Sequence, residues 1–330
     1  MGILTRDVAI DLGTANTIIY VKGKGIVVRE PSVVAIDRYS GRVVAVGDDA
    51  NQMIGRTPDN IIAVRPMKDG VIADFDITQA MIKHFIRKAD VVGLLKPKVT
   101  VCIPSGVTEV ERRAVEEAVM QAGAKSVTLI EEPMAAAIGA GLPVGRATCS
   151  MVIDLGGGST EGAVISMGGV VSSRSVRIAG DAMDSAIVNY LKKNCSINVG
   201  DKMAEEIKIA IGSAYEDDNE GMFDVRGRDV GTGLPKTIQV RESQVREAIR
   251  ENIAEILEAV NMTLEHTPPE LAADVMEQGI TLTGGGAMIK GLDKLLEEVT
   301  KLPVHVAEHP LDCVAIGTGK AMNNNKEYTK

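Results

Sequence analysis

One short pattern occurs twice in this chain and constrains its fold more than any other feature. The first copy is Asp11-Leu12-Gly13-Thr14-Ala15-Asn16-Thr17, and the second, altered copy is Asp154-Leu155-Gly156-Gly157-Gly158-Ser159-Thr160. A short apolar run precedes each copy and a β-rich run follows it, so each copy is predicted to form a β-hairpin with a glycine- and hydroxyl-rich turn. Two such hairpins predict a duplicated fold whose two lobes close around one ligand.

The residue types in the two turns suit a ligand that carries phosphates. Glycine permits φ > 0 in a tight turn and keeps Cβ atoms away from an approaching ligand, while free backbone N–H groups and hydroxyls hold phosphate oxygens. Asp11 and Asp154 end the incoming strands, where they can hold a hydrated Mg²⁺ beside the phosphates. One hairpin of this kind alone is more often an ordinary turn, so the duplication is what favours a nucleotide site.

Outside the hairpins, strand-like and helix-like stretches alternate through both halves of the chain. Residues 8–46 are predicted to be β-strands, Ala50–Arg65 a small helical and loop excursion, and 245–264 a long helix stopped by Pro268-Pro269. With 330 residues, 45% of them apolar, the chain can bury a substantial core in two domains or two halves of one. The alternation predicts sheets covered by helices, an α/β architecture.

The composition argues against several other classes. A formal net charge of −9 and an aromatic content of 2%, with no Trp, disfavour nucleic-acid binding. No apolar run approaches the ~20 residues that span a bilayer, and no signal peptide is evident. The 4 cysteines show no C-x-x-C spacing, which predicts buried free thiols in a reducing cytoplasm.

Two further stretches are candidates for binding a nucleoside. Gly284-Gly285-Gly286-Ala287 follows a strand and precedes a helix, where an α/β sheet opens toward ligand. Its bare backbone offers adenosine a flat surface, and the alternative is a tight strand–helix turn. Glu205 and Lys208 share one face of a predicted helix. They either contact the ribose or adenine of a bound nucleoside, or form a solvated ion pair, and the spacing leaves both alternatives open.

Glu131 and Glu132 stand at a predicted strand-to-helix junction. A carboxylate at such a junction can position an attacking water in line with a γ-phosphate, and only one of the two is needed. The alternative is that acidic residues simply suit a helix N-terminus.

Competing motifs are absent or wrongly placed. The chain has no G-x-x-x-x-G-K-[ST] sequence and no G-x-G-x-x-G sequence that opens a helix, so neither a P-loop nor a dinucleotide site is predicted. His305–His309 matches H-x-x-E-H, but Pro303 and Pro310 bracket a short β-like run instead of a helix. A zinc site is therefore not expected.

Leu94 and Leu95 lie in a predicted loop next to Lys96 and Lys98. Two apolar side chains beside basic ones suit an anionic membrane surface. The alternative packs both leucines under the domain.

Several motifs occur in the order found in the actin-like ATPase superfamily. They are Asp11-Leu12-Gly13-Thr14, Glu132-Pro133, Asp154-Leu155-Gly156-Gly157-Gly158, Thr283-Gly284-Gly285-Gly286 and Ile316-Gly317-Thr318-Gly319. Longer stretches make the chain similar to one branch, the MreB/Mbl family of bacterial actins, and they include Glu30–Ala35, Arg65–Phe75 and Glu308–Gly317. The resemblance runs from about Thr5 to Met322.

This resemblance implies an actin-like ATPase fold with two duplicated lobes, each a mixed sheet flanked by helices, and four subdomains. Lobe I would span 1–145, with a smaller subdomain inserted at about 33–66, and the C-terminal helix 312–330 would pack back onto it. Lobe II would span 146–311, with a smaller subdomain inserted at about 182–240.

The resemblance also implies a cleft for ATP and Mg²⁺. Asp11 and Asp154 would hold the hydrated metal, and Asp154 is also counted among the catalytic residues. Glu132 would position the lytic water, and Glu131 is the second candidate for that role. The residues expected to hold phosphates are Gly13, Thr14, Ala15, Asn16, Gly156, Gly157, Gly158 and Ser159. Those expected around adenosine are Glu205, Glu206, Lys208, Gly284, Gly285, Gly286, Ala287 and Met288.

Members of this family polymerise into paired, antiparallel protofilaments on the inner face of the cell membrane and guide cell-wall synthesis in rod-shaped cells. The resemblance therefore implies a cytoplasmic homopolymer, peripheral on that membrane, whose partners are membrane proteins of wall synthesis. It also implies that the Leu94–Leu95 loop inserts into lipid. The alternative function is a small-molecule kinase of the same superfamily, which would need a catalytic base and a substrate pocket in the cleft.

Overall fold

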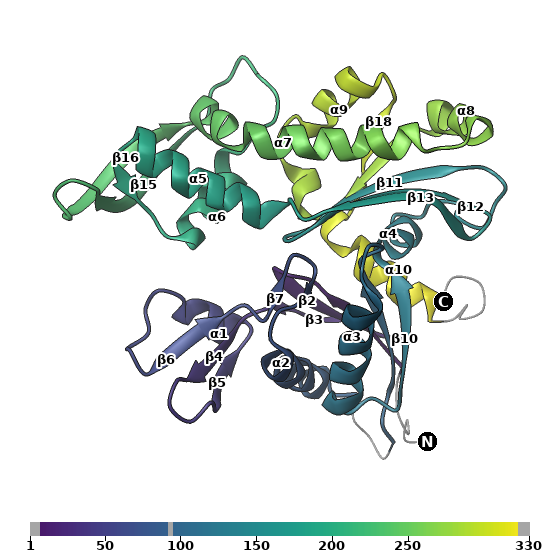
Figure 1. Cartoon of the computed structure of the whole chain (residues 1–330), viewed down its shortest axis with the longest axis horizontal. Coiled ribbons are helices and arrows are strands. Elements are labelled where there is room, and N and C mark those ends of the chain that lie inside the picture. Colours follow the sequence, from purple (N-terminus) through teal and green to yellow (C-terminus); the bar gives the residue numbers. More distant parts are fainter. Residues whose placement is uncertain (1–6, 92–94, 323–330) are drawn as a thin grey trace.

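The computed structural model of the chain describes residues 7–91 and 95–322, which form two lobes (Figure 1). A five-stranded sheet lies in each lobe, and a smaller arm projects from each lobe on the same side of the molecule. Two helices, α4 (Glu132–Gly139) and α10 (Cys313–Ala321), lie between the sheets. Within the described ranges, no helix combines the length and apolar character needed to cross a bilayer.

The sheet of the first lobe is a hairpin with strands added on both sides. Its strands, in spatial order, are β10 (Ser126–Glu131), β9 (Lys98–Ile103), β1 (Val8–Leu12), β2 (Asn16–Val21) and β3 (Gly25–Pro31). β1, β2 and β3 are antiparallel neighbours, whereas β9 and β10 run parallel to β1. Helices α2 (Phe75–Lys88) and α3 (Glu109–Ala122) bury their apolar faces in the core of this lobe.

The sheet of the second lobe repeats this plan. Its strands, in spatial order, are β13 (Gly169–Val176), β12 (Thr160–Ser166), β11 (Ser150–Leu155), β17 (Ile280–Thr283) and β18 (Val304–Val306). Again three antiparallel strands are followed by two that run parallel to the first strand of the hairpin. Helices α7 (Glu242–Glu265), α8 (Pro269–Gln278) and α9 (Leu292–Thr300) complete this lobe. The shared topology confirms the predicted duplicated α/β fold.

Each arm carries a small antiparallel sheet. The arm of the first lobe contains β5 (Val43–Val46), β4 (Val34–Asp37), β6 (Ile61–Val64) and α1 (Asp48–Met53), and β7 (Met67–Lys68) and β8 (Val71–Ile72) follow it. The arm of the second lobe contains β14 (Ile197–Asn198), β15 (Met222–Asp229), β16 (Pro235–Arg241), α5 (Gly180–Asn194) and α6 (Asp201–Ile211). The predicted boundaries of four subdomains stay a prediction.

Helices α4 and α10 each contact the lobe to which they do not belong in sequence. α4 follows β10 of the first lobe and contacts β11 and β12, whereas α10 follows the second lobe and contacts β1 and β2. The two helices meet through glycines: a Cβ on Gly139 would overlap the carbonyl oxygen of Cys313, and a Cβ on Gly317 would overlap that of Ala135. Apolar residues of both helices and both sheets form one core, which joins the lobes.

Two segments differ from the sequence expectation. The stretch Ala50–Arg65, expected to be helix and loop, contains the strand β6, which pairs with β4. The long helix α7 ends at Glu265, close to the predicted stop, but Pro269 then begins the unexpected helix α8. Proline is tolerated there because the first helical residue needs no N–H partner.

The close contact of α4 and α10 predicts that Gly317→Ala destabilises the protein. The new methyl group would collide with a backbone carbonyl, which cannot move without separating the two helices. We expect the free energy of unfolding to fall by about 3 kcal/mol in chemical denaturation. The control is Gly231→Ala in an exposed turn, where the nearest atom would be 3.5 Å away, and it should change stability by less than about 0.5 kcal/mol. Equal stability of the two variants would contradict this packing.

Candidate functional site

The two predicted hairpins form turns of the same construction. In the first, the Gly13 N–H donates to the carbonyl oxygen of Asn16 at 3.1 Å, and in the second, the Gly156 N–H donates to that of Ser159 at 3.0 Å. The strands on either side pair in the same register, with Leu12 opposite Thr17 and Leu155 opposite Thr160. The sequence duplication is therefore also a duplication of turn geometry.

The two turns lie against each other, one from each lobe. A Cβ added to Gly157 would come within 2.7 Å of the Ala15 Cβ, and a Cβ on Gly158 would collide with the Thr14 hydroxyl. That hydroxyl accepts a hydrogen bond of 2.9 Å from the N–H of Gly70, in the turn between β7 and β8. Three turns thus gather backbone N–H groups and hydroxyls at one place, as phosphate binding requires.

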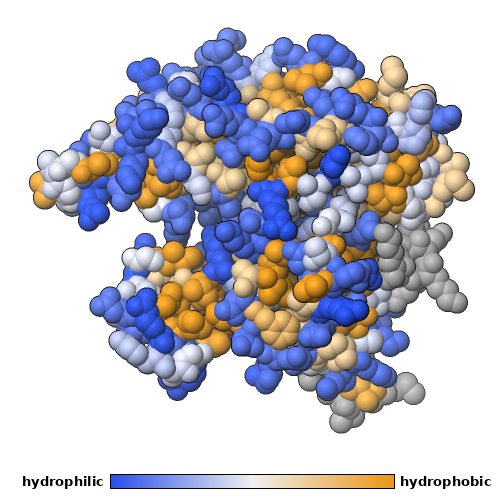
Figure 2. Space-filling view, viewed as in Figure 1, coloured by the Kyte–Doolittle hydropathy of each residue, from blue (hydrophilic) through white to orange (hydrophobic). Residues whose placement is uncertain are grey.

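A cleft separates the lobes on the side of the arms. Figure 2 shows this side of the molecule hollowed between its upper and lower halves, with hydrophilic side chains at the opening. Arg65, which follows β6 in the lower arm, and Asp181 in the first turn of α5 approach to 4.0 Å across it. The hairpin turns lie at the inner end of this cleft, because the N–H of Asp181 donates to the carbonyl oxygen of Gly157 at 2.8 Å.

Asp11 and Asp154 stand on the strands that enter the two turns, and their carboxyl groups are close enough to interact electrostatically. Burial raises the pKa of Asp11 to about 7, and the nearby Asp154 carboxylate adds to this shift. Burial also raises the pKa of Asp154 to about 6, although the Thr283 hydroxyl partly offsets this by donating a 2.6 Å hydrogen bond to the carboxylate. Thr283 holds this position because β17 runs beside β11 with Thr283 opposite Asp154. No local pattern in the sequence indicates this contact, because it depends on the register of two parallel strands.

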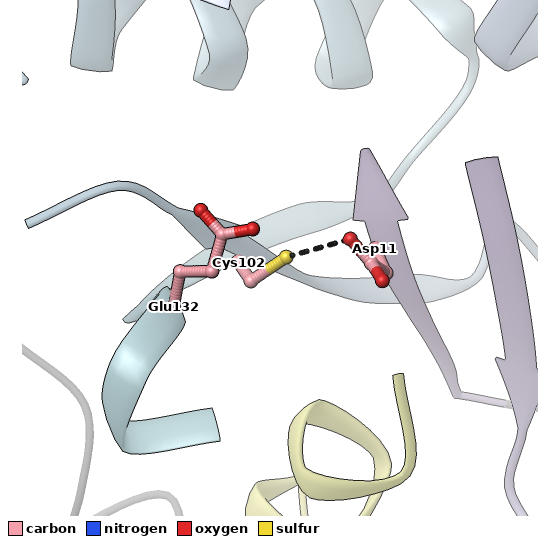
Figure 3. A group of neighbouring side chains, drawn as sticks. All are labelled: Asp11, Cys102 and Glu132. Atoms are coloured by element: carbon pink, nitrogen blue, oxygen red, sulfur yellow. Dashed lines mark hydrogen bonds between the residues drawn. The ribbon is translucent and has the colours of Figure 1, made fainter. Parts of the chain in front are cut away.

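Glu132 completes the acidic group from the first turn of α4. Figure 3 shows its carboxyl group and that of Asp11 on either side of Cys102, and one polar atom of each residue lies within 4.8 Å of those of the other two. Burial raises the pKa of Glu132 well above its ordinary value, and the Asp154, Glu161 and Asp11 carboxylates raise it further. Glu131, by contrast, is the N-cap residue of α4 and lines a separate cavity between the lobes. The structure therefore brings Glu132, but not Glu131, into the acidic group.

The Cys102 thiol acts as a hydrogen-bond donor in this group. Its Sγ lies 3.4 Å from Asp11 Oδ1 and 3.8 Å from the carbonyl oxygen of Ile10. Burial raises the pKa of the thiol well above its ordinary value, and the neighbouring carboxylates add to the shift. In the absence of a cation the thiol therefore stays protonated and donates to these oxygens.

The acidic group fits a hydrated Mg²⁺. Its carboxylates are crowded enough to raise one another's pKa, and a divalent cation beside them would favour their charged forms. Carboxylate oxygens and water are the ligands that Mg²⁺ prefers. Asp11 and Asp154 therefore remain the residues predicted to hold the ion through water.

The residues predicted to contact adenosine lie close to the second hairpin. Gly284, with φ of 79°, and the short helix η1 (Gly285–Met288) pack on Leu155 so tightly that a Cβ on Gly284 or Gly286 would meet its atoms. Lys208 of α6 donates hydrogen bonds of 2.9 Å to the carbonyl oxygen of Gly180 and to Asp184 Oδ2. The ion pair of Lys208 with Asp184 was not anticipated, because only the spacing to Glu205 is visible in the sequence.

The other predicted positions near adenosine differ in exposure. Glu206 and Met288 are exposed, Glu205 is half-buried and Ala287 is buried. Their roles stay predictions.

The predicted membrane loop is described only in part. Leu94 lies outside the described residues, and Leu95 has 49% of its surface exposed. The exposure of Leu95 is at odds with the alternative in which it packs under the domain.

Comparisons with known proteins agree over nearly the whole chain. The family model described as MreB/Mbl protein matches residues 5–330. The cell shape-determining protein Mbl of Bacillus subtilis (strain 168) is 52% identical over 326 residues, which cover 98% of each chain. The cell shape-determining protein MreB of Escherichia coli (strain K12) is 55% identical over 327 residues, which cover 97% of this chain and 94% of that one.

A solved structure shares the fold. The crystal structure of MreB 5 of Spiroplasma citri bound to AMPPNP matches with a TM-score of 0.93 at 37% identity, and the match covers 98% of each chain. The predicted actin-like fold is confirmed. These matches favour a bacterial actin over the small-molecule kinase kept as the alternative.

The raised pKa of Asp11 predicts how stability depends on pH without Mg²⁺ and nucleotide. Because the folded pKa of about 7 exceeds the ordinary 3.8, the folded state binds a proton that the unfolded chain releases, and stability falls as pH rises from about 4 to about 7. Asp11→Asn removes this penalty. We expect it to raise the free energy of unfolding by on the order of 2 kcal/mol at pH 8 in EDTA, and by less at pH 5.

The control for this measurement is Asp218→Asn, which removes one charge from an exposed loop and should change stability little at either pH. If Asp11→Asn were destabilising at pH 8, the carboxylate would be stabilised in the folded state, contrary to its surroundings.

Proposed function

The chain belongs to the MreB/Mbl family of cell shape-determining actin homologues, and from this premise we propose that it binds and hydrolyses ATP with Mg²⁺ and polymerises into paired filaments. The filaments would lie on the inner face of the cell membrane, organise membrane proteins of cell-wall synthesis and maintain rod shape. The observation that carries the ATPase proposal is the meeting of two hairpin turns, one from each lobe, around the carboxyl groups of Asp11, Glu132 and Asp154.

The two turns are proposed to hold the phosphates of ATP. Backbone N–H groups and the hydroxyls of Thr14 and Ser159 point to this role, because they converge from both lobes on one place. The nearby η1 turn and α6 would hold the nucleoside, and the chain of hydrogen bonds from Lys208 through Gly180 to Gly156 would set the distance between the two parts of the site. Bound Mg²⁺ would supply charge neutralisation for the phosphates.

Glu132 is proposed to position the lytic water and to accept its proton. Its raised pKa makes its carboxylate form a stronger base than that of an exposed glutamate, and it lies in the same acidic group as Asp11. Pro133 at the next position lies in the first turn of α4, where its fixed φ restricts the backbone next to Glu132.

Membership of the family supports filament formation, and one surface feature supports membrane binding. The relatives named above are described as cell shape-determining proteins. Leu95 exposes an apolar side chain next to Lys96, as insertion into an anionic lipid surface requires. The kinase alternative would require phosphate transfer to an added acceptor.

The role of Glu132 predicts a loss of hydrolysis without a loss of assembly. In Glu132→Ala, we expect release of phosphate from ATP to slow by about 100-fold or more, because general-base catalysis typically contributes that much, while Mg-ATP-dependent polymer still pellets. Glu131→Ala is the matched comparison and should be affected less. The opposite order would assign the water to Glu131, and phosphate release only with an added small-molecule acceptor would favour the kinase.

The role of the apolar loop predicts a specific loss of membrane binding. With Mg-ATP, wild-type polymer should pellet with vesicles that contain phosphatidylglycerol. Leu94→Ser combined with Leu95→Ser should weaken this by at least about tenfold, because two buried leucines contribute several kcal/mol. The control is Met276→Ser on α8, whose side chain is 68% exposed. Unchanged vesicle binding by the double variant would contradict the proposal.

A further inference from the structure

A buried glutamate on β12 makes a contact between the lobes that the proposed mechanism does not use. Glu161 has 0% of its surface exposed, and it stands directly opposite Asp154 in the β11–β12 hairpin. Burying a carboxyl group is costly unless it is hydrogen-bonded. Ala163 and Ile165, which share its face of β12, are buried and apolar, so another apolar side chain would fit there and the glutamate needs a specific explanation.

Glu161 is hydrogen-bonded by Ser175 within its own sheet, and two further hydrogen bonds cross from one lobe to the other. Its Oε2 accepts a 3.1 Å hydrogen bond from the backbone N–H of Ser105 and a second, short one from the Ser105 hydroxyl. Ser105 follows the end of β9, where Ile103 lies opposite Glu131 of the neighbouring strand β10. A single carboxyl group of the second lobe therefore binds the segment that follows β9. This segment lies beside β10, the strand that leads directly into Glu132.

The lobes are not tightly packed around this contact. A cavity of about 430 Å³ opens beside it, lined by Ser105 and Glu131 of the first lobe and by Gly168 and Val170 of the second. Arg177 of the second lobe also pairs with Glu111 of the first at 3.3 Å, but the Arg177 side chain is largely exposed, and solvent-exposed pairs contribute little. The buried hydrogen bonds of Glu161 are therefore well placed to set the spacing of the lobes at this point.

From this arrangement we infer that Glu161 is a positioning residue of the ATPase: it clamps the end of β9 to β12 and thereby fixes Glu132 against the second hairpin. The inference rests on the proposed hydrolysis of ATP. Glu132 stands on the first lobe, whereas half of the phosphate-holding groups stand on the second, so the attack geometry depends on how the lobes are spaced. A misplacement of about 1 Å can cost a factor of about 100 in rate.

The test separates positioning from binding and from folding. In Glu161→Ala, kcat for ATP hydrolysis should fall by about tenfold or more, while the dissociation constant of ATP should change by less than about threefold. Glu161→Gln should restore most of the rate, because its amide oxygen can accept both hydrogen bonds from Ser105. The control is Tyr190→Phe, which removes a 2.9 Å hydrogen bond to Glu247 elsewhere in the second lobe and should leave kcat unchanged.

A second variant guards against a folding failure of Glu161→Ala. Ser105→Ala removes only the hydroxyl donor, so it should lower kcat by a smaller factor with unchanged ATP affinity, and it should add nothing to Glu161→Ala in the double variant. The inference is overturned if kcat is unchanged in both single variants, if ATP affinity falls as much as kcat, or if Glu161→Gln is as slow as Glu161→Ala. A wild-type protein that hydrolyses no ATP would instead refute the proposed function.

Discussion

The main constraint on this structure is the electrostatic repulsion among carboxyl groups that the two lobes bring close together. Asp11 and Glu132 come from the first lobe and Asp154 from the second, and each has a raised pKa because burial and its neighbours disfavour its charge. At neutral pH this junction is unfavourable on its own. A cation and a phosphate chain placed between the turns would convert the repulsion into attraction, so the closeness of the lobes is coupled to the ligand.

This repulsion can be maintained because the lobes are joined firmly elsewhere. Helices α4 and α10 pack against each other through Gly139 and Gly317, and each helix also contacts the sheet of the other lobe. The core at this crossing contains residues from both sheets. At the opposite end, across the cleft, Arg65 of one arm and Asp181 of the other approach to 4.0 Å. One end of the interface is thus packed, charged groups approach at the other, and a ligand charge bound at the hairpin turns would act between these two ends.

The sequence predicted those parts of the site that are local in the chain. A hairpin turn, a strand-to-helix junction and a triple glycine are each contained in a few residues, so Asp11, the pair Glu131 and Glu132, and Gly284 could be named as candidates. The choice of Glu132 within the pair came from the family resemblance. The partners that orient them could not. Thr283 reaches Asp154 through the register of two parallel strands, Lys208 reaches Asp184 across two helices, and Ser105 reaches Glu161 between lobes. Periodicity carries no information on such pairings. β6 was missed because it pairs with β4 across the intervening β5 and α1, a partner that the local sequence does not indicate.

The two copies of the hairpin turn differ in side-chain size, and the contact between them explains this difference. The first turn carries side chains at Thr14 and Ala15, whereas the second carries glycine at 157 and 158. These positions face one another: a Cβ on Gly157 would press on Ala15, and one on Gly158 would strike the Thr14 hydroxyl. If both turns carried side chains, the lobes could not approach. If both were bare, the Thr14 hydroxyl that binds the N–H of Gly70 would be missing. The inexact repeat is therefore what steric contact between two closing turns requires, and an exact duplication would fit this site less well.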